Sequence, residues 1–134
     1  MPKLSRFLYG AWLNLETQEG PALTAAGKMF WKGSYQDYQG NNHQRSIELD
    51  QKARTLWVED MVKPQIADPQ KHLYWHLPVQ GQKDLNLRCW DEQGSELKAQ
   101  KSKTGEALYC LAEQEQQCWH FTTSGARFLT KILF

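Results

Sequence analysis

Hydrophobic and polar residues alternate along two short runs near the middle of the chain. In residues 43–49, Ile47 and Leu49 alternate with polar neighbours, and in residues 55–61 Leu56 and Val58 do the same. Alternation of period two on both sides of a polar turn is typical of an antiparallel β-hairpin with one buried face. Asp50 is expected to begin the hairpin loop because its short side chain can hydrogen-bond to the turn backbone.

The rest of the chain repeats this pattern of short strands and polar turns. Turns are expected in residues 16–21, which end in Gly-Pro, and in residues 91–94 and 101–105. Further strands are expected at 7–15, 28–35, 71–79, 84–90, 96–100, 107–112, 118–122 and 126–134. Because no segment carries a helical apolar stripe, the sequence predicts an all-β fold. We expect an antiparallel β-sandwich of about ten short strands, forming one domain over residues 1–134.

Charge and hydropathy exclude two classes of partner. Sixteen Lys and Arg oppose fifteen Asp and Glu, and this balance argues against the broad basic face of a nonspecific nucleic-acid binder. No apolar run is long enough to span a membrane. The N-terminal residues lack the apolar core and cleavage site of a secretory signal, so the sequence as it stands predicts a cytoplasmic protein. No nucleic-acid or membrane partner is expected.

Cysteine and histidine spacing gives no indication of a metal site. Cys89, Cys110 and Cys118 are odd in number and widely spaced, so we expect reduced, buried thiols and no disulfide framework. No paired Cys/His spacing typical of structural zinc is present. His72 and His76 share a face of one predicted strand, but the strand rise separates them by about 13 Å, too far for one metal ion. No metal and no cofactor are expected.

The central hairpin contains the most polar constellation of the chain. His43 and Arg45 share a face of the first strand, and hairpin pairing brings Asp60 near them. Two interpretations remain open: an Arg45–Asp60 ion pair that stabilises the hairpin, or a contact between Arg45 and an anionic ligand. No P-loop, nucleophile elbow or other catalytic pattern accompanies these residues.

Aromatic residues are abundant, with six Trp, five Tyr and five Phe. They can fill a core or cover a sheet, and an exposed ring can also stack on the apolar face of a sugar. The candidate ligand-binding residues combine such rings with nearby polar groups, and no catalytic residue is proposed. They are His43, Arg45, Trp57, Trp75 and Trp119.

Three patterns in the hairpin region carry a resemblance to a known family. They are YxxYxG in residues 35–40, HxRxIxLD in residues 43–50 and RxLxVEDxV in residues 54–62. Shorter matches lie in residues 7–11, 74–78 and 118–126, the last with departures at Cys118, Phe121 and Ala126. Together they resemble the C-terminal β-sandwich region of heparinase II/III-family polysaccharide lyases.

The resemblance implies a role in carbohydrate binding without catalysis. Family members cleave uronic-acid-containing polysaccharides by β-elimination, using catalytic groups on a helical toroid, and some hold zinc in a His-rich segment of the β region. This chain has neither a toroid nor a GHxHxD-like segment, so no catalytic or metal-binding residue is carried over. The resemblance therefore implies an accessory sandwich, inactive alone, that binds acidic polysaccharide or packs on a lyase catalytic domain.

Two other function classes stay open. Gly10-Ala11-Trp12 is similar to the G-x-W motif of lipocalins, and consecutive hairpins suit a small-molecule-binding barrel. A closed barrel around an apolar cavity would favour that function, whereas a filled core between two sheets would exclude it. A structural sandwich that pairs with a partner through a sheet edge is the other alternative. The sequence does not indicate the oligomeric state.

Overall fold

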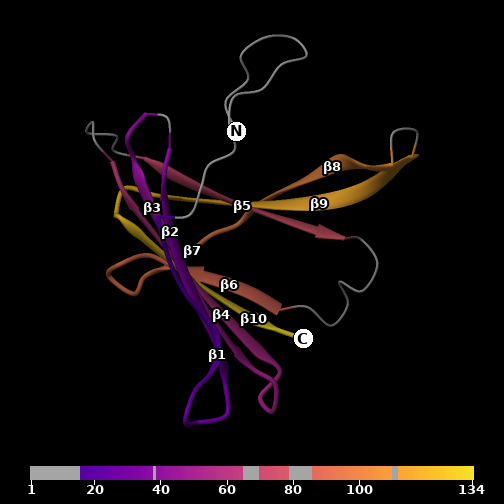
Figure 1. Ribbon diagram of the computed structural model, residues 1–134. Helices are drawn as coiled ribbons and strands as arrows, with labels where there is room; N and C mark the ends of the chain where they lie inside the picture. The colour runs from indigo at the N-terminus through magenta and orange to yellow at the C-terminus, as the bar shows by residue number, and fades with distance from the viewer. Residues whose placement is uncertain (1–15, 38, 65–69, 79–85, 110–111) are drawn as a thin grey trace.

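The computed structural model describes residues 16–37, 39–64, 70–78, 86–109 and 112–134. These residues form ten strands in two antiparallel sheets, which confirms the all-β prediction (Figure 1). No helix in this described part of the chain could cross a membrane. The strands are β1 (Thr17–Leu23), β2 (Met29–Gln36), β3 (Asn42–Asp50), β4 (Thr55–Lys63), β5 (Lys71–Pro78), β6 (Asn86–Trp90), β7 (Glu96–Leu97), β8 (Gln100–Tyr109), β9 (Ala112–Thr123) and β10 (Arg127–Leu133).

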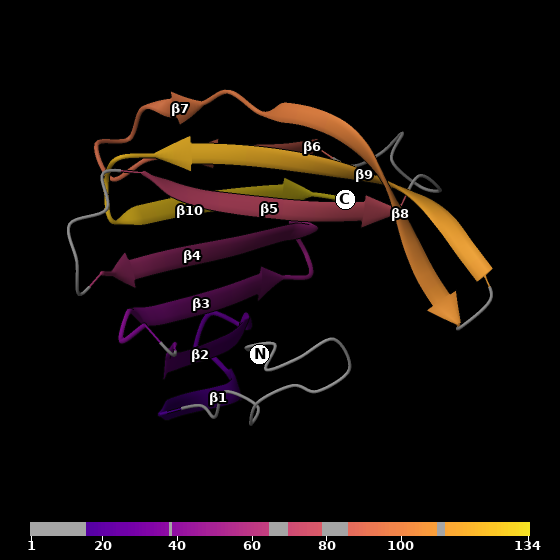
Figure 2. The same ribbon diagram turned by 90° about the horizontal axis from the view of Figure 1, so that it is seen from above.

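The two sheets differ in size and overlap only in part. The larger has seven strands in the order β1-β2-β3-β4-β10-β6-β7, and the smaller has three in the order β5-β9-β8. Figure 2 shows that the smaller sheet lies over the β10 and β6 side of the larger one, and that β1, β2 and β3 extend beyond its cover. Among the described strands, this face of the larger sheet is therefore covered by the smaller sheet near β10 and β6 and uncovered over β1, β2 and β3 (Figure 2).

The core fills the region where the sheets overlap. Its buried residues come from β5, β6, β9 and β10, and alternation directs them between the sheets. In β6, for example, Leu87 and Cys89 are buried while Asn86 and Arg88 are exposed, as the sequence pattern predicts. The core cluster comprises Leu73, Leu77, Leu87, Cys89, Phe121, Phe128 and Ile132.

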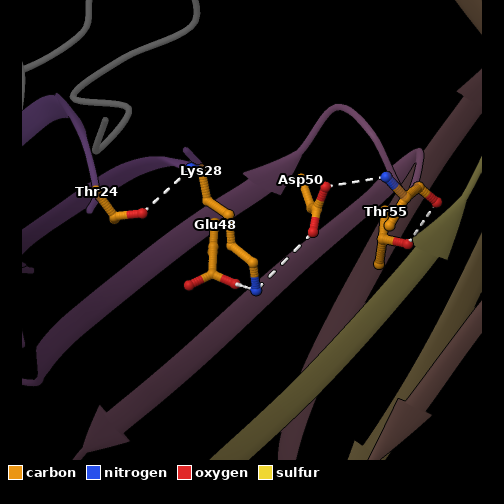
Figure 3. Close-up of polar contacts among 6 residues, drawn as sticks. Thr24, Lys28, Glu48, Asp50 and Thr55 are labelled. Atoms are coloured by element: carbon orange, nitrogen blue, oxygen red, sulfur yellow. Dashed lines mark hydrogen bonds and ion pairs between the residues drawn. The ribbon is translucent and has the colours of Figure 1, made fainter. Parts of the chain in front are cut away.

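The central hairpin forms as predicted, with strands that extend one or two residues further. Asp50 begins its loop, and the carboxylate of Asp50 accepts a hydrogen bond from the Ala53 amide at 2.9 Å. Lys28 from the turn before β2 lies against the same end of the hairpin, with Nζ 2.9 Å from Glu48 and 4.0 Å from Asp50 (Figure 3). These half-exposed ion pairs are worth little individually, so the register depends mainly on the buried face of the strands.

Two expected turns prove to be strand. Residues 17–23 form β1 although the Gly-Pro sequence predicts a loop, because β1 is an edge strand with an irregularity between Glu19 and Ala22 that accommodates the proline. Residues 101–105 lie within β8, since its pairing with β9 continues through them. The expected strand at 96–100 is shorter, with only Glu96 and Leu97 in β7.

Gly20 is essential to the path of β1 beside β2. Its φ is +82°, and a Cβ at this position would lie 2.5 Å from the Phe30 carbonyl oxygen of β2. Gly27 has a similar φ of +76° with nothing within 4 Å of an added Cβ, so it is a matched control. We expect Gly20→Ala to increase amide exchange in β1 about tenfold more than Gly27→Ala does, because only Gly20→Ala adds a backbone clash to the φ strain. Equal effects in hydrogen-exchange mass spectrometry would contradict this.

The structure also bears on the expectation of buried thiols and on the lipocalin-like alternative. Cys89 and Cys118 are free and buried, as expected, whereas Cys110 lies outside the described residues. The expected strand at 7–15 and the Gly10-Ala11-Trp12 motif also lie outside them. The described strands form two open sheets around a filled core, which is not the closed cavity required by the lipocalin-like alternative.

Candidate functional site

The open half of the larger sheet carries a polar cleft. Tyr35 of β2, His43 and Arg45 of β3, and Asp60 of β4 line it, and His72 at the start of β5 borders it. The cleft has a volume of about 420 Å³ and adjoins a hollow of about 670 Å³ that also includes His43 and His72. Below, the inner cleft means the site formed by Tyr35, His43, Arg45 and Asp60.

Strand register explains why these side chains meet. Arg45 lies opposite Asp60 on one side and opposite Gly33 on the other, and Asp60 lies opposite the buried Phe128. Residues opposite one another share a face, so this row continues from the core into the open part of the sheet. Gly33, which has no side chain, is buried and also lines the cleft beside Arg45.

Arg45 is held by a bidentate ion pair. Its Nε donates to Oδ1 of Asp60 at 2.6 Å and its Nη2 donates to Oδ2 at 3.1 Å. The Arg45 side chain is 45% exposed while that of Asp60 is 13% exposed, and the guanidinium lies 5.8 Å from the Trp75 ring centre. The ion pair predicted from the hairpin is therefore present. It uses one edge of the guanidinium, and the described residues provide no hydrogen-bond partner for Nη1.

His43 is also fixed by two contacts. Its ring stacks on Tyr35, with centroids 4.8 Å apart and planes 4° from parallel. Its Nε2 lies 2.9 Å from Oδ2 of Asp37, and since a carboxylate only accepts, Nε2 donates. The hydrogen bond described for this ring does not use Nδ1 of His43, so in a neutral ring this nitrogen can accept one. The hydrogen bond described for His43 goes to Asp37, and no Ser, Thr or Cys among the described residues hydrogen-bonds to its ring, so these contacts do not form a nucleophilic triad.

Asp37 organises the turn before β3 and is ionised over a wide pH range. Burial acts to raise its pKa, but hydrogen bonds from His43, from the Asn41 side chain and from the Asn41 and Gln39 amides outweigh burial and lower the pKa to about 2. A lowered pKa in the folded state stabilises the protein at pH values above the ordinary carboxyl pKa, and this stabilisation is lost as the pH falls toward 2.

We therefore expect Asp37→Asn to lower the free energy of unfolding by about 1–2 kcal/mol at pH 7. The difference from the unmodified protein should shrink as the pH falls from 4 toward 2, because the wild-type carboxylate then becomes protonated. Urea unfolding across this pH range measures both values. A difference that stays constant with pH would show that the effect of the substitution does not come from ionisation of Asp37.

Tyr35 contributes a neutral hydroxyl to the inner cleft. Burial raises its pKa above the ordinary value, an effect that the nearby Arg45 partly offsets. The hydroxyl is therefore protonated at neutral pH and can donate or accept a hydrogen bond. Arg45 is balanced by Asp60 and His43 lies against Asp37, so the site combines fixed polar groups with little net charge.

The five sequence-predicted ligand residues do not form one site. His43 and Arg45 line the inner cleft and Trp75 lies beside Arg45, whereas Trp57 lies on the opposite face of the larger sheet, near Trp90. Trp119 is half-buried against the core, with Lys101 Nζ 3.8 Å from its ring centre. Lys131 similarly lies 5.1 Å from the Trp57 ring centre. A cation lies near each of these three rings, and the rings lie in different parts of the molecule, so they do not form one stacking surface.

The structure also shows a polar cluster that sequence reasoning missed. His72 of β5 and His120 of β9 lie 2.9 Å apart, between Nδ1 and Nε2, on the outer face of the smaller sheet. Forty-eight positions separate them, and only the β5–β9 register brings them together. Among the described residues, no group of three or more His, Cys, Asp or Glu is arranged to hold a metal ion.

Comparison with known proteins adds no relative. No family model matches the chain, and neither a curated protein nor a solved structure matches it. The inner cleft must therefore be interpreted from its own chemistry.

Proposed function

We propose that this protein is a non-catalytic binding module and that the inner cleft binds an acidic saccharide. The observation that carries the proposal is the state of Arg45, whose guanidinium is fixed along one edge by Asp60 while Nη1 lacks a described partner. A guanidinium has two edges that can each hold a carboxylate in a planar, bidentate geometry. The second edge suits the carboxylate of a uronic acid.

The remaining groups of the inner cleft suit sugar hydroxyls. The Tyr35 hydroxyl and Nδ1 of a neutral His43 can each hydrogen-bond to a hydroxyl, and both rings are held in place by their mutual stacking. Such preorganised polar groups bind without the entropic cost of ordering flexible side chains. Because Asp60 offsets part of the Arg45 charge, we expect modest affinity that falls with added salt.

The heparinase II/III resemblance supports the same ligand class, since that family acts on uronic-acid-containing polysaccharides. Under this proposal the chain acts as an accessory sandwich and does not cleave the glycan. Packing on a lyase catalytic domain is a compatible second role, in which the inner cleft would lie beside the substrate path of the partner.

Arg45→Ala tests the proposal against a closely matched control. Arg88 on β6 also makes a bidentate ion pair, with Glu96 at 2.8 and 2.7 Å, and lies 5.2 Å from a tryptophan ring centre, but it projects from the outer face. In tryptophan-fluorescence titrations with heparan sulfate, alginate and hyaluronan fragments, we expect Arg45→Ala to weaken binding at least tenfold, roughly the value of one charge-assisted hydrogen bond. Arg88→Ala should bind as tightly as the unmodified protein.

Three results would contradict the proposal. A flat response to all three glycans would leave a scaffold that contacts other proteins as the better account. Equal losses in Arg45→Ala and Arg88→Ala would indicate nonspecific charge attraction. Unchanged binding in Arg45→Ala would place the glycan elsewhere on the protein.

A further inference from the structure

The outer face of the smaller sheet carries a row of near-parallel aromatic rings. Alternation along β5 directs Leu73 and Leu77 into the core, so His72 and Tyr74 project from the opposite face. Tyr74 lies opposite His120 of β9, and their rings stack with centroids 4.3 Å apart and planes 5° from parallel. The His72 and His120 ring centroids are 5.1 Å apart with planes at 19°. This face is accessible, since Tyr74 is 54% exposed.

The contact between the two histidines has the spacing of a metal chelate. Their nearest nitrogens, Nδ1 of His72 and Nε2 of His120, are 2.9 Å apart. Metal–imidazole bonds of about 2.0–2.1 Å at a right angle also place two adjacent ligand nitrogens about 2.9 Å apart. Rotation of each ring about its Cβ–Cγ bond would direct both lone pairs at one ion, while the paired strands hold the two backbones at a fixed distance.

We propose that His72 and His120 form a binding site for a divalent, imidazole-preferring metal ion, with Cu²⁺ bound more tightly than Ni²⁺. Two imidazoles with water in the remaining positions suit the tetragonal geometry of Cu²⁺, which also binds nitrogen ligands most tightly among the first-row divalent ions. This site uses the outer face of the smaller sheet and does not involve Arg45, so it can be tested independently of the saccharide proposal, although His72 also borders the inner cleft.

The proton balance of binding is simple. In the free protein, one of the two facing nitrogens carries the hydrogen of the N–H···N hydrogen bond. Metal coordination requires lone pairs on both facing nitrogens, so this hydrogen leaves to water while the other nitrogen of the same ring takes up a hydrogen. When both rings are neutral, binding therefore releases no net proton.

His76 provides the control for a binding experiment. It lies on the same strand and the same exposed face as His72, but the described contacts do not pair it with His120. Calorimetric titration of the full chain with Cu²⁺ in a non-coordinating buffer is expected to give one site per chain. His72→Ala and His120→Ala should each weaken the affinity at least tenfold, and His76→Ala should not change it.

Electron paramagnetic resonance of the Cu²⁺ complex gives a second readout that does not depend on affinity. Hyperfine coupling from two imidazole nitrogens is expected in the unmodified protein and in His76→Ala, and from one in each of the other variants. Circular dichroism checks that the variants fold, and either His72→Ala or His120→Ala alone suffices for the test. The proposal would be overturned if a folded His72→Ala or His120→Ala variant bound copper as tightly as the unmodified protein. An equal loss of affinity in His76→Ala would also overturn it.

Discussion

Phe121→Ala is expected to lower the free energy of unfolding by about 3–5 kcal/mol, the range for removal of a buried phenylalanine ring. Phe121 is 2% exposed, lies on β9, and packs in the core cluster that joins the smaller sheet to β6 and β10 of the larger one. Removal of the ring loses its burial and leaves a cavity that two paired sheets cannot readily close. Urea unfolding monitored by circular dichroism measures the change.

Phe134→Ala is the control for this prediction. Phe134 is 44% exposed, and its ring contacts the Arg54 guanidinium at 6.0 Å without entering the core. We expect its loss to cost under about 1 kcal/mol. If both substitutions cost the same, the core would not lie between the two sheets as described.

Cys89 is expected to react with iodoacetamide at least about a hundredfold more slowly in the folded protein than in urea, because alkylation requires an exposed thiolate. Cys89 is fully buried, and burial raises the pKa of its thiol to about 11, with partial relief from the Thr130 hydroxyl, which lies 3.7 Å from Sγ. Quenched labelling followed by peptide mass spectrometry resolves Cys89 from the other cysteines.

The predictions for Phe121 and Cys89 can be tested together, because both depend on the same buried core. If Cys89 is labelled only after unfolding, its labelling rate follows the population of the unfolded state, so each ~1.4 kcal/mol of stability lost in Phe121→Ala should accelerate labelling about tenfold, while Phe134→Ala should accelerate it by less than about tenfold. Rapid labelling of Cys89 in the native unmodified protein would contradict the burial on which both predictions depend.

The fold was predictable wherever burial imposes a pattern on the side chains. Residues 43–49 and 55–61 alternate because one face of their hairpin continues into the core, and this alternation is sufficient to identify β3 and β4 from the sequence. The segment around Gly20 and Pro21 lacks such a pattern because every residue of β1 is exposed, so its turn-like composition suggested a loop. The polar residues 101–103 are likewise exposed, although they lie within β8.

The site was predictable only where its residues are neighbours in one hairpin. Arg45 and Asp60 were paired from the sequence because hairpin register fixes which residues lie opposite. The Trp57 side chain could also have been assigned to the outer face, since it alternates with the inward-facing Leu56 and Val58. His72 and His120 are different, because β5 and β9 are distant in sequence and their register depends on the packing of the whole smaller sheet.

Under the proposed function, an acidic saccharide binds to the edge of the Arg45 guanidinium that Asp60 does not occupy. Nuclear magnetic resonance titration of ¹⁵N-labelled protein with a uronate oligosaccharide tests it most directly, since the Arg45 Nε–H signal reports on the guanidinium itself. The account predicts that the largest shifts fall on the Arg45 Nε–H and on the amides of β2, β3 and β4 around Tyr35 and His43. Shifts confined to the outer face around Trp57 and Trp90, or the absence of any shift at saturating ligand, would contradict it.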